Sequence, residues 1–188
     1  MGIRAEPLGF GRATLASTSP TRHLAAGSSH QGLLLQLTVS TNEELQEHVE
    51  GSGGIFVIRG SPVARSWNGI QYKIGMSSKN VPAKQLSMNV AVVPPGAVAF
   101  AHVHVGFEVM LYILQGNVRH EYGDGLKQSV DNAAGDFIYI EPGVPHEVFN
   151  LSDTEPVVAV VARSDAEEWA HIVTYDRTTG RLGDRLEP

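Results

Sequence analysis

Two histidines and a glutamate within seven residues give this stretch of the sequence its clearest capacity for chemistry. His102 and His104 are separated by one residue, and Glu108 follows four residues later. On a β-strand, side chains two residues apart point to the same face, so the two imidazoles are expected to lie side by side. Imidazole nitrogens and carboxylate oxygens are ligands of divalent transition metals. The spacing therefore indicates a metal site.

A straight strand cannot bring Glu108 to the metal that the histidines bind. His104 and Glu108 would lie about 13 Å apart at roughly 3.3 Å per residue, whereas metal ligands lie about 2.1 Å from the ion. If all three bind, the chain reverses between them, and Gly106 is the residue that tolerates an unusual backbone there. A further candidate ligand, His146, follows a Pro-Gly turn at the start of another expected strand. Together with His102 these residues suit Fe, Mn, Ni, Zn or Cu as one divalent ion, with about two coordination positions left open.

Short β-strands separated by turn residues are expected to carry this site. Strand-like runs occur at residues 55–59, 70–75, 86–93, 97–104, 108–114, 117–122, 127–130, 137–140, 146–150 and 157–163. Glycine, proline, asparagine and aspartate occupy the breaks between them, which predicts an antiparallel sandwich or barrel. No alternation of strands with helices occurs, so a parallel α/β fold is not expected.

The two ends of the chain differ from this central region. Residues 33–39 are apolar and are expected to form a first strand or a docking segment, and residues 42–50 a short helix that ends at the following glycines. After the last long strand, we expect a small helix over 165–170 and a hairpin around 177–180.

Composition narrows the class of protein and its partners. The 188 residues suit one domain, the formal net charge is −6, and there are no cysteines. These values argue against nucleic acid and membrane as partners, and they exclude disulfides, zinc–thiolate sites and thiol catalysis. No apolar run approaches the roughly 18 residues that span a bilayer. A cytoplasmic location is expected.

The first 30 residues have a composition of their own. They are rich in Ser, Ala and Gly, and carry Arg4, Arg12 and Arg22 against Glu6. This pattern is found in organelle-targeting segments, and equally in a disordered leader or an arm that covers a neighbouring subunit. The expected organisation is therefore a leader or arm over 1–30 and a single domain over 31–188.

Taken together, the two histidine-containing stretches resemble the two motifs of the cupins. The first motif is matched by Gly96, His102, His104, Glu108 and Gly116, and the second by Gly135, Gly143, His146 and Asn150. Two departures occur: Glu141 stands where the second motif has proline, and the interval from Glu108 to Gly116 is one residue longer than in the strictest form. The longer interval is similar to that of a group of single-domain bacterial cupins.

The resemblance implies a fold, a cofactor and an assembly. The fold is an all-β double-stranded β-helix, the cupin or RmlC-like jelly-roll barrel, with a short N-terminal helix and a small C-terminal extension. The cofactor is one divalent metal ion inside the barrel, held by His102, His104, Glu108 and His146. Homodimerisation is also implied, with residues 33–39 as the candidate segment for addition to the partner's sheet.

The expected function is that of a metal-binding oxidoreductase, of the Fe(II)- or Mn(II)-dependent dioxygenase type, acting on a small enol, diketone or phenolic substrate. Glu108 is a candidate base, and Tyr112, which shares its strand parity, is a candidate hydroxyl near the metal. The alternatives are a metal-dependent isomerase or lyase and a ligand-binding barrel without catalysis. Fold analogy does not choose among these classes.

Four other residues outside the ligand set carry specific expectations. His120 is expected to be a satisfied strand residue. Arg163 is expected either to form a structural ion pair or to hold a substrate carboxylate through its bidentate fork. Trp67 and Trp169 are assigned to packing or to a subunit contact.

Overall fold

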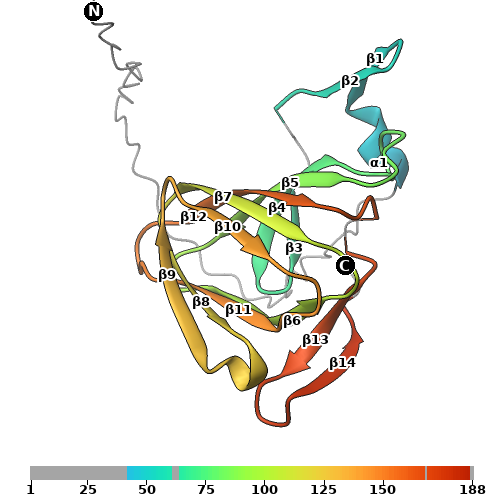
Figure 1. Ribbon diagram of the computed structural model, residues 1–188. Helices are drawn as coiled ribbons and strands as arrows, with labels where there is room; N and C mark the ends of the chain where they lie inside the picture. The colour runs from blue at the N-terminus through green and yellow to red at the C-terminus, as the bar shows by residue number, and fades with distance from the viewer. Residues whose placement is uncertain (1–41, 61–63, 168, 187–188) are drawn as a thin grey trace, which may run out of the picture. The chain divides into compact units, whose positions relative to one another are not determined.

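Two six-stranded antiparallel sheets form this structure, a computed structural model that describes residues 42–60, 64–167 and 169–186 (Figure 1). In spatial order, the first sheet contains β10 (Phe137–Ile140), β7 (Val109–Gln115), β12 (Val157–Arg163), β5 (Ser87–Val93), β4 (Ile70–Met76) and β3 (Ala64–Trp67). The second contains β14 (Arg181–Arg185), β13 (Ile172–Asp176), β6 (Val98–His104), β11 (His146–Asn150), β8 (Asn117–Tyr122) and β9 (Gln128–Ala133). From β5 to β12 the chain passes repeatedly from one sheet to the other, as in a jelly-roll barrel.

Three smaller elements complete the described part of the chain. Helix α1 (Asn42–Glu47) is followed by a separate hairpin of β1 (Val49–Ser52) and β2 (Ile55–Ile58). A single 3₁₀ turn, η1 (Asp124–Leu126), lies between β8 and β9. None of the helices in the described residues is long and apolar enough to cross a membrane.

The central strands agree closely with the sequence-based prediction, and the all-β barrel fold is confirmed. β8, β10, β11 and β12 have the predicted bounds. The expected helix over 42–50 is shorter, because its last residues form β1, and the glycines that follow make the turn to β2 instead of ending the helix. The expected helix over 165–170 is not found, since the described residues there lie in turns. The hairpin around 177–180 is confirmed as the connection between β13 and β14.

Strand alternation determines which side chains reach the barrel interior. In β4, Ile70, Tyr72 and Ile74 are buried, whereas Gln71 and Lys73 are exposed. The buried faces of the two sheets supply one apolar core, whose largest members are Trp67, Tyr72, Phe107 and Trp169. Both tryptophan rings pack on Tyr72, at 5.8 and 5.6 Å between ring centroids, so the packing role predicted for them is confirmed.

The tight turn between β3 and β4 brings a polar side chain to the interior. Asn68 and Gly69 have φ values of 49° and 81°, as a two-residue hairpin turn requires. A side chain at position 69 would also collide with the Val98 carbonyl oxygen. This position therefore requires glycine both for its positive φ and for lack of space. The Asn68 amide donates to the carbonyl oxygen of Phe100 on β6, at 2.9 Å.

The outer face of the first sheet exposes several large apolar side chains. Met88, Met110 and Phe137 come from three of its strands and are 53%, 58% and 82% exposed. Because β7 contributes apolar side chains to this face and to the core, its two faces differ little in polarity. Homodimerisation stays a prediction. The division into residues 1–30 and a domain over 31–188 also stays a prediction, because 1–30 and the expected strand at 33–39 lie outside the described residues.

Candidate metal site

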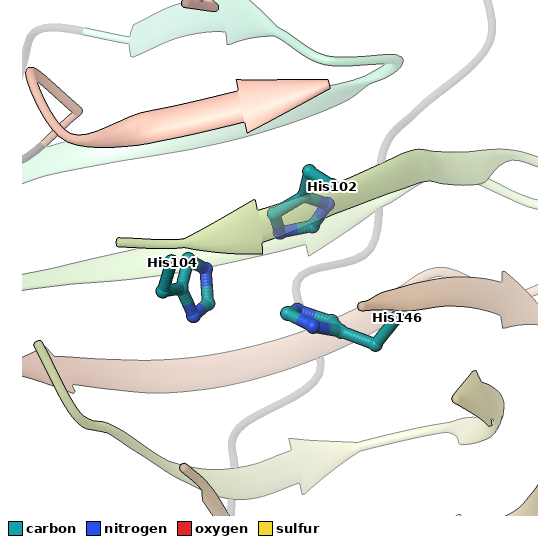
Figure 2. Close-up of side chains that lie close together, drawn as sticks. All are labelled: His102, His104 and His146. Atoms are coloured by element: carbon teal, nitrogen blue, oxygen red, sulfur yellow. The ribbon is translucent and has the colours of Figure 1, made fainter. Parts of the chain in front are cut away.

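Three histidines from two adjacent strands point at one another inside the barrel (Figure 2). His102 and His104 lie on β6, and His146 begins β11, where it pairs with His102. One ring nitrogen from each histidine can be chosen so that all three lie within 4.8 Å of one another. All three residues are buried, at 6%, 4% and 3% exposure. The convergence predicted for these three side chains is therefore found.

Backbone carbonyl groups orient two of the rings. His102 Nδ1 lies 2.7 Å from the carbonyl oxygen of Phe100, and His146 Nδ1 lies 3.0 Å from that of Val144. Because a carbonyl oxygen only accepts hydrogen bonds, these contacts favour the tautomer with the proton on Nδ1 and a lone pair on Nε2. At His102, the Asn68 amide nitrogen also lies 3.2 Å from Nδ1. His104 is oriented differently, by stacking on Phe107 at 5.0 Å.

Burial keeps the three imidazoles neutral. The pKa values of His102 and His104 are lowered well below the usual range, mainly because burial disfavours the charged form and secondarily because His146 lies beside them. The pKa of His146 is also lowered by burial. Metal ligation requires neutral imidazole, so the site is in the correct protonation state at neutral pH.

The arrangement fits a divalent transition metal ion. Ligands that each lie about 2.1 Å from one ion are at most about 4.2 Å apart, so the observed limit of 4.8 Å is a few tenths of an ångström from coordination. Nδ1 of His104 is buried and has no hydrogen-bond partner in the part of the chain that the structure describes. Lone pairs that converge without a donor between them repel, and a cation at their centre removes this cost. Three neutral nitrogen donors are typical ligands of Zn, Cu, Fe and Ni.

Glu108 does not join this group, which corrects the prediction for this residue. The chain does turn at Gly106, where φ is 80°, as predicted. However, Glu108 is exposed, and its Oε1 accepts a hydrogen bond from the Tyr139 hydroxyl at 2.8 Å. The next residue, Val109, is only 2% exposed and lines the cavity beside the histidines. The extra residue between Glu108 and Gly116 thus places valine, and not the carboxylate, on the inner face.

Tyr112 is likewise on the outer side of the sheet. It shares the parity of Glu108, as predicted, but that parity leads away from the histidines. Its ring packs against Phe137 at 4.5 Å between centroids, on the outer face of β7 and β10. The prediction that Tyr112 lies near the metal is therefore wrong in this structure.

Glu108→Gln should accordingly leave metal binding intact. The substitution keeps the hydrogen-bonding shape and removes only a charge that lies on the exposed side of the chain. We expect the same metal content per chain as in the unsubstituted protein, measured by elemental analysis after loading and desalting. A marked loss of metal would show that the carboxylate turns inward when the ion binds.

Two neighbouring spaces adjoin the histidines. The inner cavity, of about 70 Å³, is lined mainly by valine, leucine and isoleucine together with the three histidines. A cleft of about 480 Å³ lies next to it, between β8–β9 and β10. The two spaces share His120, Ile138, Ile140 and His146 in their linings. The cleft therefore borders the inner cavity at His146, one of the three converging histidines.

Sequence reasoning missed two polar residues of the inner cavity. His120 is predicted to be satisfied, but it is 4% exposed, and neither ring nitrogen makes a well-formed hydrogen bond to a described residue. Its pKa is lowered to about 4 by burial and by His146, while a hydrogen bond of poor geometry with the Asn132 side chain acts in the opposite direction. Tyr72 also lines the cavity, and burial raises the pKa of its hydroxyl. The signal for His120 was present, since the charged neighbours Arg119 and Glu121 fix its inward parity.

Arg163 also reaches the cavity. It is 4% exposed, lines the cavity, and donates from Nη1 to the Asn89 side-chain oxygen at 2.8 Å. Its guanidinium lies 5.9 Å from the centre of the Tyr72 ring. Glu141, which stands where the second motif has proline, is exposed and lines the outer cleft.

Comparison with known proteins finds a cupin domain in the central part of the chain. The model of the cupin domain matches residues 89–163. Among solved structures, Lactobacillus farciminis oxalate decarboxylase in a formate complex has 19% identity and a TM-score of 0.54, over 62% of this chain and 35% of that one. A variant of Bacillus subtilis oxalate decarboxylase has 24% identity and a TM-score of 0.52, over 63% and 33%. An oxalate oxidase in complex with glycolate has 23% identity and a TM-score of 0.49, over 57% and 55%.

These likenesses concern the fold. The chain spans about a third of the length of the oxalate decarboxylases and about half that of the oxalate oxidase. No curated protein matches the chain. The matched residues 89–163 include both histidine-containing strands and the strands that face them across the cavity. Residues 89–163 thus match the cupin domain, in agreement with the jelly-roll topology and the paired histidine motifs.

Proposed function

We propose that this protein binds one divalent transition metal ion through His102, His104 and His146, and uses it to oxidise a small organic substrate. The observation that carries the proposal is the convergence of three buried, neutral imidazoles on one point beside a cavity. Such an ion acts as a Lewis acid and offers open positions to a small oxygenated molecule or O2. With three protein ligands instead of four, about three of six positions remain open.

The chain's own residues would orient the substrate and exclude water. Aliphatic side chains surround the histidines in the inner cavity, so a bound molecule is largely dry. Carbonyl groups of Phe100 and Val144 hold two of the imidazoles in one tautomer and one orientation. Neither Glu108 nor Tyr112 is proposed to take part in the chemistry.

The lining of the cleft favours an uncharged substrate. Among the described residues that line it, no lysine or arginine occurs, and Glu141 adds a negative charge at the rim. In the cleft, a dianion such as oxalate would meet this carboxylate, and the described lining there offers no lysine or arginine to balance it. The cationic Arg163 lies in the lining of the inner cavity, where its Nη1 donates to Asn89. An enol, diketone or phenol therefore suits the approach to the site better than a dicarboxylate.

The proposal is tested on the full chain purified without a metal-affinity column. Elemental analysis should find about one transition metal ion per chain after loading with Fe(II) or Mn(II). O2 consumption is then measured with 2,4-pentanedione, catechol and oxalate, with the His146→Ala variant as the inactive control. We expect uptake with one of the first two compounds and none with oxalate.

Three results would contradict the proposal, each at a different point. Failure to retain any of Fe, Mn, Ni, Zn or Cu would refute the metal site. Retention of metal without O2 uptake on a wider set of enols and phenols would refute the oxidoreductase, and would favour the isomerase, lyase or ligand-binding alternatives. Uptake with oxalate alone would refute the substrate class.

A further inference from the structure

His120 is a buried polar side chain whose hydrogen bonding is incomplete. It is 4% exposed, and Asn132 is a hydrogen-bond partner of its ring only at poor geometry, so Nδ1, Nε2 and Asn132 Oδ1 all lack a well-formed hydrogen bond to a described residue. A buried donor or acceptor that is left unpaired destabilises the fold, and such groups in native proteins call for a specific explanation. An apolar residue at this position would avoid that cost. The histidine therefore has a use other than packing.

The register of β8 determines where this ring lies. β8 pairs with β11, so that Tyr122 is opposite His146 and His120 is opposite Val148. His120 is two residues from Tyr122, the partner of His146, and therefore lies on the same face of β8 as Tyr122. The charged neighbours Arg119 and Glu121 take the other face, where each has an ion-pair partner, Asp131 and Arg177 respectively. The ion pairs of Arg119 and Glu121 hold these two residues on the outer face, so His120, which lies between them, points inward.

His120 lies next to the three-histidine group without being part of it. It lines the inner cavity together with all three ligand residues, and it lines the outer cleft together with His146. The set of nitrogens within 4.8 Å of one another does not include it. His120 is thus placed at the junction of the two spaces, where a molecule that enters by the cleft would pass or rest.

We propose that His120 is a substrate-binding residue, whose imidazole hydrogen-bonds a hydroxyl or carbonyl oxygen of an uncharged organic molecule held beside the metal. This inference rests on the proposed function and names a contact within it. A neutral imidazole has one N–H donor and one nitrogen acceptor, so it can pair with either kind of oxygen. The aliphatic side chains Val130, Ile138 and Ile140 around it would contact the carbon skeleton. Occupation of the site would satisfy the unpaired ring.

The test uses the full chain loaded with Co(II), whose visible spectrum reports changes at the ion, and 2,4-pentanedione as the probe. The variants are His120→Leu, which removes both polar atoms, and His120→Gln, which retains a donor and an acceptor. His48→Gln is the control, because His48 is exposed and lies outside both spaces. Metal content, the probe's Kd and the thermal midpoint of the probe-free protein are measured for each.

We expect His120→Leu to retain Co(II) and to weaken probe binding by about tenfold, the loss of one hydrogen bond at a buried site. His120→Gln should recover part of the affinity. The probe-free His120→Leu protein should be as stable as the unsubstituted chain or more so, because an unpaired polar group has been removed. A residue with a purely structural role would instead lower the thermal midpoint and leave the probe's Kd unchanged.

Two outcomes would overturn the inference while the proposed function stands. Loss of Co(II) from His120→Leu would make His120 a metal ligand, and an unchanged Kd in a metal-loaded variant would exclude contact with the probe. Failure of the unsubstituted chain to take up any metal is a different result: it would refute the proposed function, on which this inference rests.

Discussion

Replacing His146 by alanine is expected to weaken transition metal binding by more than about 100-fold. Loss of groups that only orient a ligand costs about 10–100-fold in metal affinity, and His146 is itself one of three converging donors. Two imidazoles from one strand would remain, with solvent or a small cavity in place of the third. The affinity is measured by competition with a chromophoric chelator, using Zn(II) or Co(II).

His48→Ala provides the matched control for this experiment. It removes an imidazole from an exposed position and should leave the affinity unchanged. His102→Ala and His104→Ala should resemble His146→Ala, whereas Glu108→Gln should resemble the control. If His146→Ala bound metal as tightly as the unsubstituted chain, the ion would have to sit elsewhere, and the three-histidine site would be refuted.

The metal-free protein is expected to lose stability steeply between about pH 6.5 and pH 4. His120 has a folded-state pKa of about 4, against about 6.5 in an unfolded chain. Between these two pH values the imidazole is protonated in the unfolded state and largely unprotonated in the folded state. The free energy of unfolding therefore falls as the pH falls through this window. For His120 alone the loss reaches about 3 kcal/mol at pH 4. His102, His104 and His146 act in the same direction, because burial lowers their pKa values too.

Urea unfolding in the presence of a chelator, at pH 7.5, 6 and 5, measures this effect. The His120→Leu variant should show a shallower dependence on pH, with about one proton fewer taken up on unfolding. Protons also compete with metal for the same lone pairs, so metal affinity should fall over the same range. A free energy of unfolding that stays constant from pH 7.5 to pH 5 would mean that the four rings are accessible to protons in the folded state.

The sequence predicted the barrel well because its strands are bounded by strong turn residues. The Pro-Gly turn before His146 fixes the start of β11. The Gly116-Asn117 pair fixes the boundary between β7 and β8. The spacing of His102 and His104 fixed their common face by the same argument. The convergence with His146 followed from the resemblance of the two motifs to those of the cupins, and not from local pattern alone.

The errors at Glu108 and Tyr112 have one physical cause, which is the lack of polarity contrast in β7. Val109, Leu111 and Ile113 alternate with Met110, Tyr112 and Leu114, so both faces of the strand are apolar. When both faces of a strand are apolar, the sequence pattern does not show which set of residues faces the core. The prediction placed Glu108 and the residues of its parity on the inner face. The longer interval between Glu108 and Gly116 indicated the opposite parity, with Val109 inward. In β8 the contrast was present, since Arg119 and Glu121 flank His120, but it was given too little weight.

The ends of the chain were harder to predict because their strands depend on distant partners. β13 pairs with β6 on one side and with β14 on the other, and neither pairing has a local signal beyond the hairpin at 177–180. β3 is defined by its pairing with β4 across the Asn68-Gly69 turn. Strand formation of this sort is decided by neighbouring strands more than by intrinsic preference.

Asn150, which matched the second motif in the sequence, has a consequence for how the two sheets are joined. Its Nδ2 donates to the carbonyl oxygens of Val93, Pro94 and Glu155, at 3.0, 3.0 and 2.8 Å, and its Oδ1 accepts from the Ser152 amide at 2.9 Å. One side-chain amide thus connects the end of β5, the end of β11 and the approach to β12. Aspartate has nearly the same shape but offers no donor, and leucine offers neither donor nor acceptor. Deamidation of Asn150 during prolonged storage would therefore place a carboxylate next to three carbonyl oxygens. The hydrogen bonds that join the two sheets at this position would be lost, and the contact between the sheets would be weakened.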